Sequence, residues 1–143
     1  MKTLTQKILF KNTSPEELYE MYMDSKLHSM LTGDKAKITK KEGTSYTAYG
    51  DYIKGKNLQL IPGKLIVQSW RASDWKKTDM DSTFLLALEK KGNDAVLNMV
   101  HANIPEDQVE GIKSGWTDYY WAPWKAHLAG KKISNKKHMQ SYF

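Results

Sequence analysis

Cysteine is absent from the 143 residues of this chain, which excludes disulfide bonds and thiolate metal sites. Because disulfides are typical of oxidising compartments, we expect a reducing one, the cytoplasm. No apolar run approaches the roughly 20 residues that a membrane-spanning helix needs. The first ten residues, MKTLTQKILF, interrupt their apolar residues with polar ones, unlike a signal peptide. The sequence therefore predicts no membrane span.

Arginine and paired histidines are also scarce. Arg71 is the single arginine among 22 basic residues, although arginine is the preferred side chain for bidentate contacts with guanine and phosphate. The four histidines lack the HxH and HExxH spacings that are typical of metal ligands. We therefore expect neither a nucleic-acid partner nor a metal site.

The formal net charge of +6 is concentrated at one end of the chain. Residues 131–143 hold four lysines and no acidic residue, so the preceding residues carry 18 basic and 16 acidic side chains. A chain of this length is long enough to form one domain with a sizeable core. We therefore predict a single domain over residues 1–130 and a basic C-terminal tail over residues 131–143.

Motifs of common enzyme classes are missing. The sequence has no G-x-S-x-G nucleophile elbow, no Walker phosphate loop and no dinucleotide-binding glycine fingerprint, so no cofactor is predicted. His101 with a tyrosine could perform acid–base chemistry, but the sequence places no second catalytic group beside it. We therefore predict no catalytic residues and favour a non-enzymatic protein, with an enzyme as the weaker alternative.

The longest helical pattern covers residues 104–128. At about 100° per residue, one stripe of this helix is strongly apolar and aromatic. The stripe contains Val109, Ile112, Trp116, Tyr119, Tyr120, Pro123 and Trp124. Pro105 suits the first turn, and Pro123 should kink the helix by freeing the carbonyl of Tyr119. So large an aromatic surface is expected to pack on something concave and apolar.

Strand patterns and two short helices precede this helix. Ser14-Pro15 with Glu17 predicts a capped helix start, and Asp24 with Gly33 predicts the limits of a second helix. Turn residues separate seven segments with strand-like patterns. These are 3–11, 35–41, 44–50, 52–61, 64–72, 80–90 and 94–103. The short connections predict antiparallel pairing. The order of elements predicts an α+β fold, β-α-α-β6-α, in which a curved antiparallel sheet wraps around the long C-terminal helix.

Several segments resemble one known family. They are TSPEELY at 13–19, LTG at 31–33, Gly50 with Gly55, IPGKLIVQSWR at 61–71 and HANIPEDQVEGIKSGWTDYYW at 101–121. Together they are similar to the SRPBCC, or START-like, superfamily. Within it they resemble the branch named for the activator of the heat-shock-90 chaperone ATPase, a eukaryotic cochaperone that carries such a domain at its C-terminus. The resemblance implies a helix-grip fold, also called birch-pollen-allergen-like, with a hydrophobic cavity between sheet and helix.

Alternation along the strands and the aromatic stripe predict which side chains line that cavity. They are Ile66, Gln68, Trp70, Phe84, Leu97, Met99, His101, Trp116, Tyr119, Tyr120 and Trp124. The aromatic members could equally be plain core. Gln68, His101 and Asn103 are polar, and a buried polar group without a partner costs about 1–3 kcal/mol. They either bond to one another, the backbone or water, or they orient the polar end of an apolar ligand.

The loop over residues 72–79, ASDWKKTD, holds the least explained aromatic residue, Trp75. Trp75 either folds back over the sheet or is an exposed anchor for a partner protein, where tryptophan is enriched. Arg71 just before it is expected to form an ion pair on the outer face of the sheet. Its candidate partners are Glu42, Asp79 and Asp81, and such surface pairs contribute about 0–1 kcal/mol.

Three functions remain open from the sequence. The favoured one is a non-enzymatic protein that encloses a small hydrophobic or amphipathic ligand, driven by burial of apolar area. The alternative is a chaperone-interaction module with a heat-shock chaperone as its partner, as the resemblance implies. The third is a cyclase- or hydrolase-like enzyme that depends on His101.

Overall fold

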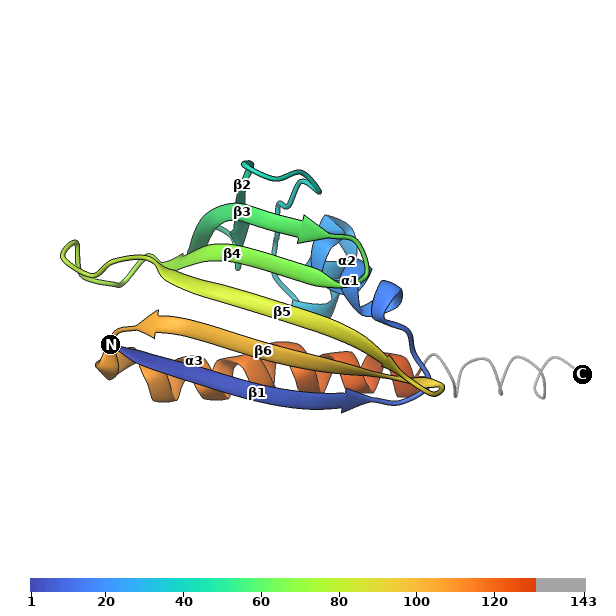
Figure 1. Ribbon diagram of the computed structural model, residues 1–143. Coiled ribbons are helices and arrows are strands. Elements are labelled where there is room, and N and C mark those ends of the chain that lie inside the picture. Colours follow the sequence, from blue (N-terminus) through green and yellow to red (C-terminus); the bar gives the residue numbers. More distant parts are fainter. Residues whose placement is uncertain (131–143) are drawn as a thin grey trace, which may run out of the picture.

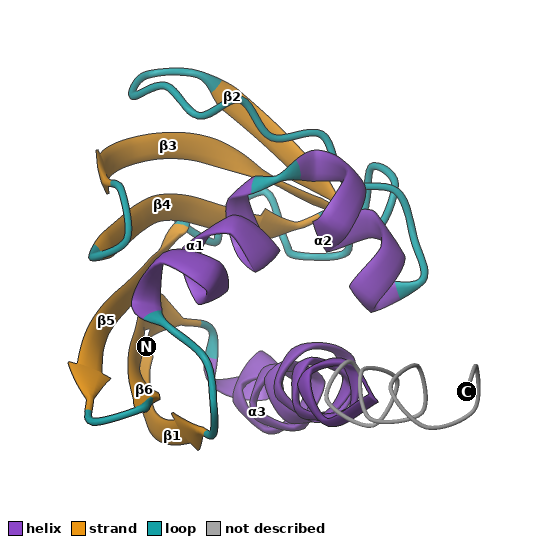
Figure 2. Cartoon of the chain, turned by 90° about the vertical axis from the view of Figure 1, so that its right-hand side faces the viewer, coloured by secondary structure: helices purple, strands orange, loops and turns teal. Residues whose placement is uncertain are grey.

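The computed structural model describes residues 1–130, and these form a six-stranded antiparallel sheet with helices on one side (Figure 1). The strand order in the sheet is β1-β6-β5-β4-β3-β2. The strands are β1 (Lys2–Phe10), β2 (Ser45–Ala48), β3 (Ile53–Ile61), β4 (Leu65–Ala72), β5 (Ser82–Lys91) and β6 (Asp94–Ile104). The sheet curves strongly, and the helices lie in its concave side (Figure 2).

Two short helices connect β1 to β2, as predicted. They are α1 (Pro15–Met23) and α2 (Ser25–Thr32). The Ser14 hydroxyl caps α1 by accepting from the Glu17 N–H at 3.1 Å, and Asp24 caps α2 by accepting from the Leu27 N–H at 2.9 Å. Gly33 ends α2 at φ 80°, a conformation that costs glycine little. Local capping chemistry therefore fixes where both helices begin and end.

The predicted strand over residues 35–41 is wrong. This segment makes only an isolated bridge between Lys37 and Thr47. Its Ala36 and Ile38 are buried and alternate as in a strand. Its backbone, however, bonds to hydroxyl groups of α2: the Ala36 N–H donates to Ser29 Oγ and the Ile38 N–H to Ser25 Oγ, both at 2.8 Å. The segment is therefore tied to a helix, and the sheet has one strand fewer than expected.

The C-terminal helical segment lies along the concave face of the sheet. It consists of a 3-10 turn η1 (Glu106–Gln108), α3 (Val109–Trp116), a π-helical turn η2 (Thr117–Trp121) and a further helical stretch over residues 122–130. In the π-turn the Ala122 N–H donates to the Thr117 carbonyl, five residues back. Pro123 follows directly and has no N–H to donate. The sequence predicts a kink at Pro123 but not the π-turn, which lies directly before that proline.

This π-turn changes which side chains face the sheet. Because a π-turn rotates each residue by less than the α-helical angle, the buried stripe shifts by one position. Trp116, Tyr120 and Trp124 are buried as predicted, but Trp121 is buried as well and Tyr119 is 56% exposed. The Trp121 indole N–H donates to Gln6 Oε1 on β1 at 2.6 Å. Of the two residues predicted toward the margins of the stripe, Tyr119 therefore lies at the rim, whereas Trp121 lies in the core.

The inner face of the sheet and the buried stripe form one aromatic core. Trp116 stacks on Phe84 with ring centroids 4.4 Å apart and on Trp121 at 5.6 Å. Phe10 contacts Trp121 and Trp124 from the end of β1. Each such fully buried side chain contributes about 1.5–3 kcal/mol through apolar burial. The predicted arrangement, a curved antiparallel sheet gripping the terminal helix, is confirmed.

Candidate functional site

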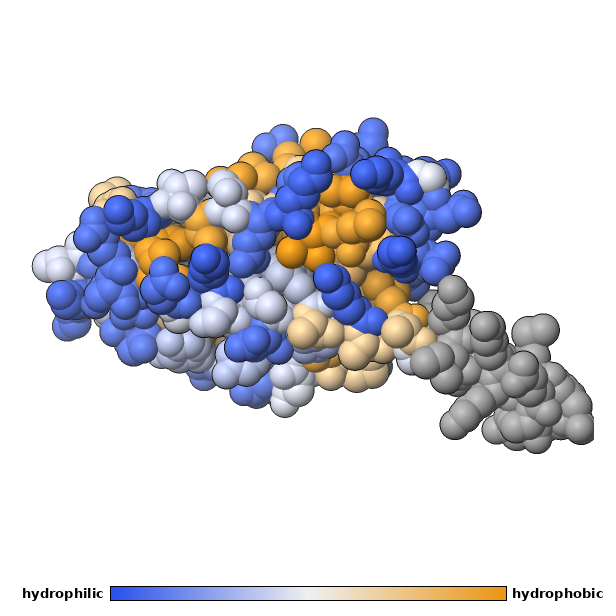
Figure 3. Space-filling model, turned by 90° about the horizontal axis from the view of Figure 1, so that it is seen from below, coloured by the Kyte–Doolittle hydropathy of each residue, from blue (hydrophilic) through white to orange (hydrophobic). Residues whose placement is uncertain are grey.

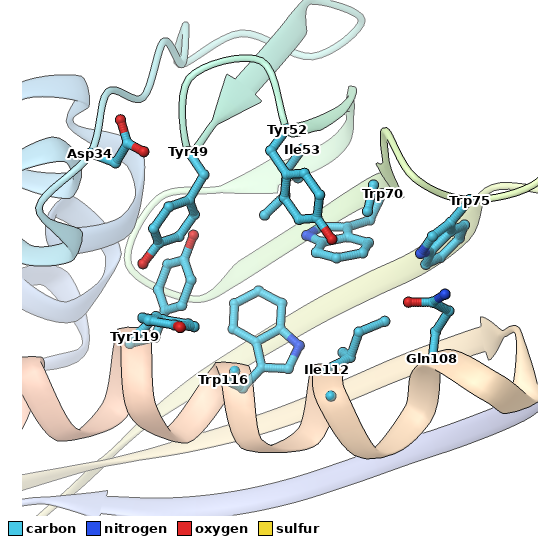
Figure 4. A pocket seen from close by; sticks show the side chains of 14 residues that line it. Asp34, Tyr49, Tyr52, Ile53, Trp70, Trp75, Gln108, Ile112, Trp116 and Tyr119 are labelled. Atoms are coloured by element: carbon cyan, nitrogen blue, oxygen red, sulfur yellow. The ribbon is translucent and has the colours of Figure 1, made fainter.

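A pocket of about 510 Å³ opens between α3, the β2–β3 turn and the β4–β5 loop (Figure 4). Half of its fourteen lining residues are aromatic. The lining residues are Asp34, Tyr49, Tyr52, Ile53, Trp70, Ala72, Trp75, Gln108, Gly111, Ile112, Gly115, Trp116, Tyr119 and Tyr120. This volume is within the range of small-molecule sites, about 300–1,000 Å³.

Two glycines on α3 leave space on the helix side of the pocket. Gly111 and Gly115 are one helical turn apart and both line it. A Cβ added at Gly111 would meet no atom within 4 Å, and one at Gly115 would only touch the Tyr119 ring at 3.8 Å. Larger residues here would project side chains into the open volume. The pocket therefore depends on small residues where the rest of the helical stripe is bulky.

Aromatic contacts fix the walls. Tyr49 packs edge-on against Tyr119, with centroids 5.5 Å apart, and against Tyr120 at 6.4 Å. Trp70 packs against Trp75 at 5.6 Å and faces Trp116 at 6.3 Å. Tilted and edge-on pairs of this kind contribute about 0.5–1.5 kcal/mol beyond their buried area. The walls are thus held by packing within the protein.

Two polar groups of the wall lack hydrogen-bond partners. The Tyr49 hydroxyl and the Trp75 indole N–H are buried and bond to no described atom. Burial raises the pKa of Tyr49 to about 12; nearby Thr32 has a smaller, opposite effect on it, without the geometry of a hydrogen bond. Buried polar groups in proteins are nearly always paired. The two residues that carry these groups line the pocket, but the groups themselves are buried behind its surface.

Trp75 is held in place by Arg71, the single arginine. The Arg71 Nη1 donates to the Asp79 carbonyl at 2.6 Å and to the Asp81 carboxylate at 3.3 Å, so the predicted ion pair is confirmed with Asp81. Its guanidinium carbon lies 6.0 Å from the centre of the Trp75 ring. Trp75 is only 6% exposed. The alternative of an exposed anchor for a partner is therefore corrected: this tryptophan folds back onto Trp70.

The pocket includes only four of the eleven residues predicted to line a cavity: Trp70, Trp116, Tyr119 and Tyr120. The other seven lie in the packed core, each no more than 1% exposed, and do not line this pocket. They are Ile66, Gln68, Phe84, Leu97, Met99, His101 and Trp124. Asn103 also lies elsewhere: its φ of 63° breaks the strand alternation, and its amide donates to the Asp81 carbonyl. The open space lies at one end of the C-terminal helical segment, because aromatic rings fill the middle of the interface between that segment and the sheet.

Residues of the β2–β3 turn were missed as lining residues. Tyr49 and Tyr52 flank this turn, and both face the pocket (Figure 4). An aromatic pair in a turn is a usable sequence signal, because turns rarely supply core residues. The i, i+4 glycine pair on the predicted helix was a second such signal. Both signals indicate a gap next to an aromatic wall.

His101 is structural, because both of its ring nitrogens are used. The Ser82 hydroxyl donates to the Trp70 carbonyl at 2.7 Å, so at 2.8 Å it accepts from His101 Nε2–H. His101 Nδ1 then accepts from the Trp116 indole N–H at 3.1 Å. Burial lowers the pKa of His101 to about 3. The imidazole is therefore neutral, with its proton on Nε2, and is not turned toward the pocket.

Gln68 and His28 belong to two other buried networks. Gln68 accepts from the Tyr22 hydroxyl and donates to Asn57 Oδ1, both at 2.8 Å. His28 Nδ1 donates to the Tyr22 carbonyl at 2.7 Å, and its Nε2 accepts from the Tyr120 hydroxyl at 2.9 Å. Burial lowers the pKa of His28 to about 4, against a smaller opposite effect of the Tyr22 carbonyl. Gln68 and His101, both predicted for the cavity, thus bond to other side chains of the core and not to each other.

Residues 1–130 contain neither a metal-binding cluster nor a membrane-spanning helix. Among them no cluster of three or more acidic or histidine side chains could hold a metal ion. None of their helices is long and apolar enough to cross a membrane. On the face seen from below, hydrophobic residues gather in two patches rimmed by hydrophilic ones (Figure 3).

Comparison with known proteins decides the family. The family model described as Activator of Hsp90 ATPase homolog 1-like protein matches residues 12–129. The chain belongs to this family. Its sequence is 30% identical over 124 residues to the human Activator of 90 kDa heat shock protein ATPase homolog 1, covering 85% of this chain and 36% of that protein. The Dictyostelium discoideum homolog is also 30% identical, over 116 residues, which are 80% of this chain and 30% of that protein.

Solved structures show the same fold. An Hsp90 activator from Plasmodium falciparum superimposes with a TM-score of 0.83 at 23% identity, covering 90% of this chain and 97% of that one. The Aha1 dimer from Colwellia psychrerythraea gives a TM-score of 0.63 at 19% identity, covering 96% and 95%. The predicted resemblance and helix-grip fold are thus confirmed. The chain spans about a third of the length of the curated relatives it matches.

Proposed function

We propose that this member of the Hsp90-activator family acts as an interaction module for an Hsp90-type chaperone. The supporting observation is that the match to relatives named as activators of the 90 kDa heat shock protein ATPase covers 85% of the chain. A second point is the occupied interior: packed aromatic rings fill the middle of the sheet–helix interface, so partner binding at the surface does not require a large cavity. The sequence alone favours ligand enclosure and leaves this function as the alternative.

The convex face of the sheet offers a surface for such a partner. Within residues 1–130 no helix covers it, since the helices described there lie on the concave side (Figure 2). Val67, Leu85 and Val100 lie next to one another in register on β4, β5 and β6, and each is partly exposed. Ile61, 41% exposed, pairs with Leu65 in the neighbouring row. A contiguous apolar row of this kind on an uncovered sheet face is typical of protein interaction surfaces.

A binding titration with the purified Hsp90-type chaperone of the same organism tests this proposal. Leu85→Glu places a charge in the apolar row and should weaken binding about tenfold or more, equivalent to ~1.4 kcal/mol. Thr83→Glu, on the same strand and face but outside the row, is the matched control and should bind as the wild type. If the Leu85→Glu variant binds the chaperone as tightly as the wild type, the apolar row is not the binding surface. Absence of wild-type binding would contradict the function.

A second function is supported by the pocket: enclosure of a small aromatic or amphipathic molecule. The observation in its favour is about 510 Å³ of space lined by seven aromatic side chains. Burial of an aromatic ligand would contribute about 25 cal/mol per Å² of apolar area. This retains the ligand hypothesis but moves the site from the centre of the interface to one end.

Filling the pocket from the helix side tests this second function. The fluorescent probe 1-anilinonaphthalene-8-sulfonate should bind the wild type with enhanced emission. Gly115→Leu projects a side chain into the space without a backbone clash and should lower the affinity about tenfold or more, ~1.4 kcal/mol. Ala129→Leu, on the same helical segment outside the lining, is the control. Equal probe binding by all three proteins would count against a ligand in this pocket.

A further inference from the structure

Three lysines form a cluster on the convex face of the sheet, at the corner made by β2 and β3. Lys54 and Lys56 are two residues apart on β3 and therefore point to the same face. Lys54 lies opposite Thr47 of β2, and Thr47 in turn lies opposite Lys37 in the isolated bridge. Directly opposed residues of antiparallel segments share a face. Lys37 is thus next to the other two lysines, across one strand.

The burial of neighbouring residues shows that this is the outer face. All three lysines of the cluster are exposed. Ala36 and Ile38, which flank Lys37, are buried, and so is Ile53, which precedes Lys54. The cluster therefore faces away from the concave side that holds the helices (Figure 2).

The positive charge of this cluster is not balanced locally. No acidic side chain within residues 1–130 forms an ion pair with any of its three lysines. Arg71, the register partner of Lys54 on β4, is already paired with Asp81 at 3.3 Å. Like charges that lie opposite each other destabilise a sheet. The sheet therefore carries grouped positive charges at a cost in stability.

Hydroxyl groups lie among the lysines. Ser45 is the register partner of Lys56, and Thr47 lies between Lys37 and Lys54. Ammonium and hydroxyl groups both donate hydrogen bonds to carboxylate oxygens, and the bond from an ammonium group is the stronger because it is charge-assisted. The corner is therefore a surface of donors with a positive charge, which fits an anionic partner.

The lysine cluster lies beside the apolar row of Val67, Leu85 and Val100. Val67 and Arg71 face outward on the same strand, four residues or about 13 Å apart. Lys54 is the register partner of Arg71 on the neighbouring strand. A typical interface, with about 800 Å² buried on each partner, is wide enough to cover both features. An apolar centre with a charged rim is also the usual arrangement of such interfaces.

We propose that the protein bound by the convex face carries grouped Asp or Glu side chains beside an apolar patch, and that these carboxylates bind the lysine cluster. This inference rests on the chaperone-binding function proposed above and specifies the chemistry of the chaperone surface. A nucleic acid fits less well, because its phosphate groups offer no apolar surface to the row. Exposed charges at a rim act mainly on association, through a long-range attraction that salt weakens.

Association kinetics with the purified Hsp90-type chaperone of the same organism test the inference, at about 50 and about 300 mM salt. The test variant combines Lys37→Gln, Lys54→Gln and Lys56→Gln. We expect its association rate to fall about tenfold or more at low salt and to depend less on salt than that of the wild type, with the dissociation rate nearly unchanged. Because the variant relieves like-charge repulsion, its thermal unfolding should occur no earlier than that of the wild type.

A second triple variant is the matched control. It combines Lys26→Gln, Lys113→Gln and Lys125→Gln, which change the net charge by the same amount. These three lysines are exposed and belong to helical segments on the other side of the sheet. The control should associate within about twofold of the wild-type rate and keep its salt dependence.

Each outcome decides for or against the cluster. Slower association confined to the first variant, with a weaker salt dependence, supports the inference. Equal slowing of both variants, or wild-type association that salt does not change, overturns it while chaperone binding stands. Binding of a duplex DNA oligonucleotide that only the first variant loses would assign the cluster to nucleic acid and overturn it as well. Absence of wild-type chaperone binding overturns the inference together with the proposed function.

Discussion

Hydrogen bonds on both ring nitrogens hold the buried histidines in one protonation state. His101 donates through Nε2 to Ser82 and accepts at Nδ1 from Trp116, and His28 is bonded on both sides in a similar way. A proton added to His101 Nδ1 would face the Trp116 N–H, a donor opposite a donor. Protonation therefore breaks a bond in the core in addition to burying a charge.

The pH dependence of stability follows from these two residues. Their folded pKa values, about 3 for His101 and about 4 for His28, lie below the ordinary 6.5. The unfolded chain therefore binds more protons below pH 6.5, and the stability should fall as the pH drops from 6.5 toward 4. Each histidine contributes at most about 1.4 kcal/mol per pH unit in that window.

Urea unfolding at pH 7, 6 and 5 measures this slope. His101→Gln keeps an amide that can donate to Ser82 and accept from Trp116, but it does not titrate. We expect its free energy of unfolding to change less with pH, so that the difference from the wild type narrows by about 2 kcal/mol between pH 7 and pH 5. Parallel curves for the two proteins would contradict the neutral, hydrogen-bonded His101.

Removing the hydroxyl of Tyr22 and removing that of Tyr49 should change the stability of the protein in opposite directions. Tyr22→Phe deletes the donor to Gln68 and leaves its buried carbonyl oxygen unpaired, so we expect a loss of about 1–3 kcal/mol. Tyr49→Phe deletes a buried hydroxyl without a hydrogen-bond partner among residues 1–130, and we expect a change between zero and about 1 kcal/mol of stabilisation. Thermal unfolding compares them directly. A destabilised Tyr49→Phe variant would indicate a partner for this hydroxyl.

At the scale of elements, Gly55 allows β2, β3 and β4 to approach closely. A Cβ at this position would lie 1.8 Å from the Ser69 carbonyl oxygen and 2.7 Å from the Tyr46 ring. The Tyr46 hydroxyl donates to that same carbonyl at 2.7 Å across the glycine. Any side chain at residue 55 must therefore push the strand or the tyrosine away, at the corner where the sheet curves.

Gly55→Ala should accordingly destabilise the protein by about 3 kcal/mol or more, a value typical of severe backbone clashes. Gly111→Ala is the control on α3, where the added Cβ meets nothing within 4 Å. It should stabilise by about 0.5–1 kcal/mol, the usual gain from replacing glycine within a helix. Denaturant unfolding of both variants tests the pair. Equal changes in the free energy of unfolding would show that the close approach of Ser69 does not require glycine at residue 55.

The elements themselves were largely predictable, because their signals are local. Ser14-Pro15, Asp24 and Gly33 act within one helical turn, so α1 and α2 follow from the sequence. The strand prediction over residues 35–41 failed because the backbone there bonds to the side chains of Ser25 and Ser29, which belong to α2. Strand alternation alone does not distinguish pairing with a strand from pairing with hydroxyl groups.

The site was less predictable than the elements, because a π-turn changes which residues of the C-terminal helical segment face the sheet. A uniform helical angle placed Tyr119 in the stripe, whereas the π-turn at η2 rotates it outward and turns Trp121 in. The same alternation that correctly assigned Gln68 and His101 to the inner face could not tell a packed interior from an open one. Packing of Phe84 against Trp116 fills that interior, and no spacing rule contains this information.

At the scale of the whole molecule, one curved sheet presents two different surfaces. Its concave side grips the terminal helix and leaves the aromatic pocket at one end. Its convex side carries the row of Val67, Leu85 and Val100, and no helix of the described part of the chain lies over that row (Figures 1 and 2). Because the core separates these surfaces, a substitution in the row should leave the pocket intact, and a substitution in the pocket should leave the row intact.

The most direct measurement of the central claim is the ATPase rate of the Hsp90-type chaperone from the same organism, titrated with this protein. We predict a saturable rise with the wild type and with Gly115→Leu, because the pocket is not needed for it. Leu85→Glu should require about tenfold or more protein for the same rise, ~1.4 kcal/mol. A rate that stays unchanged at saturating wild-type protein would contradict the account.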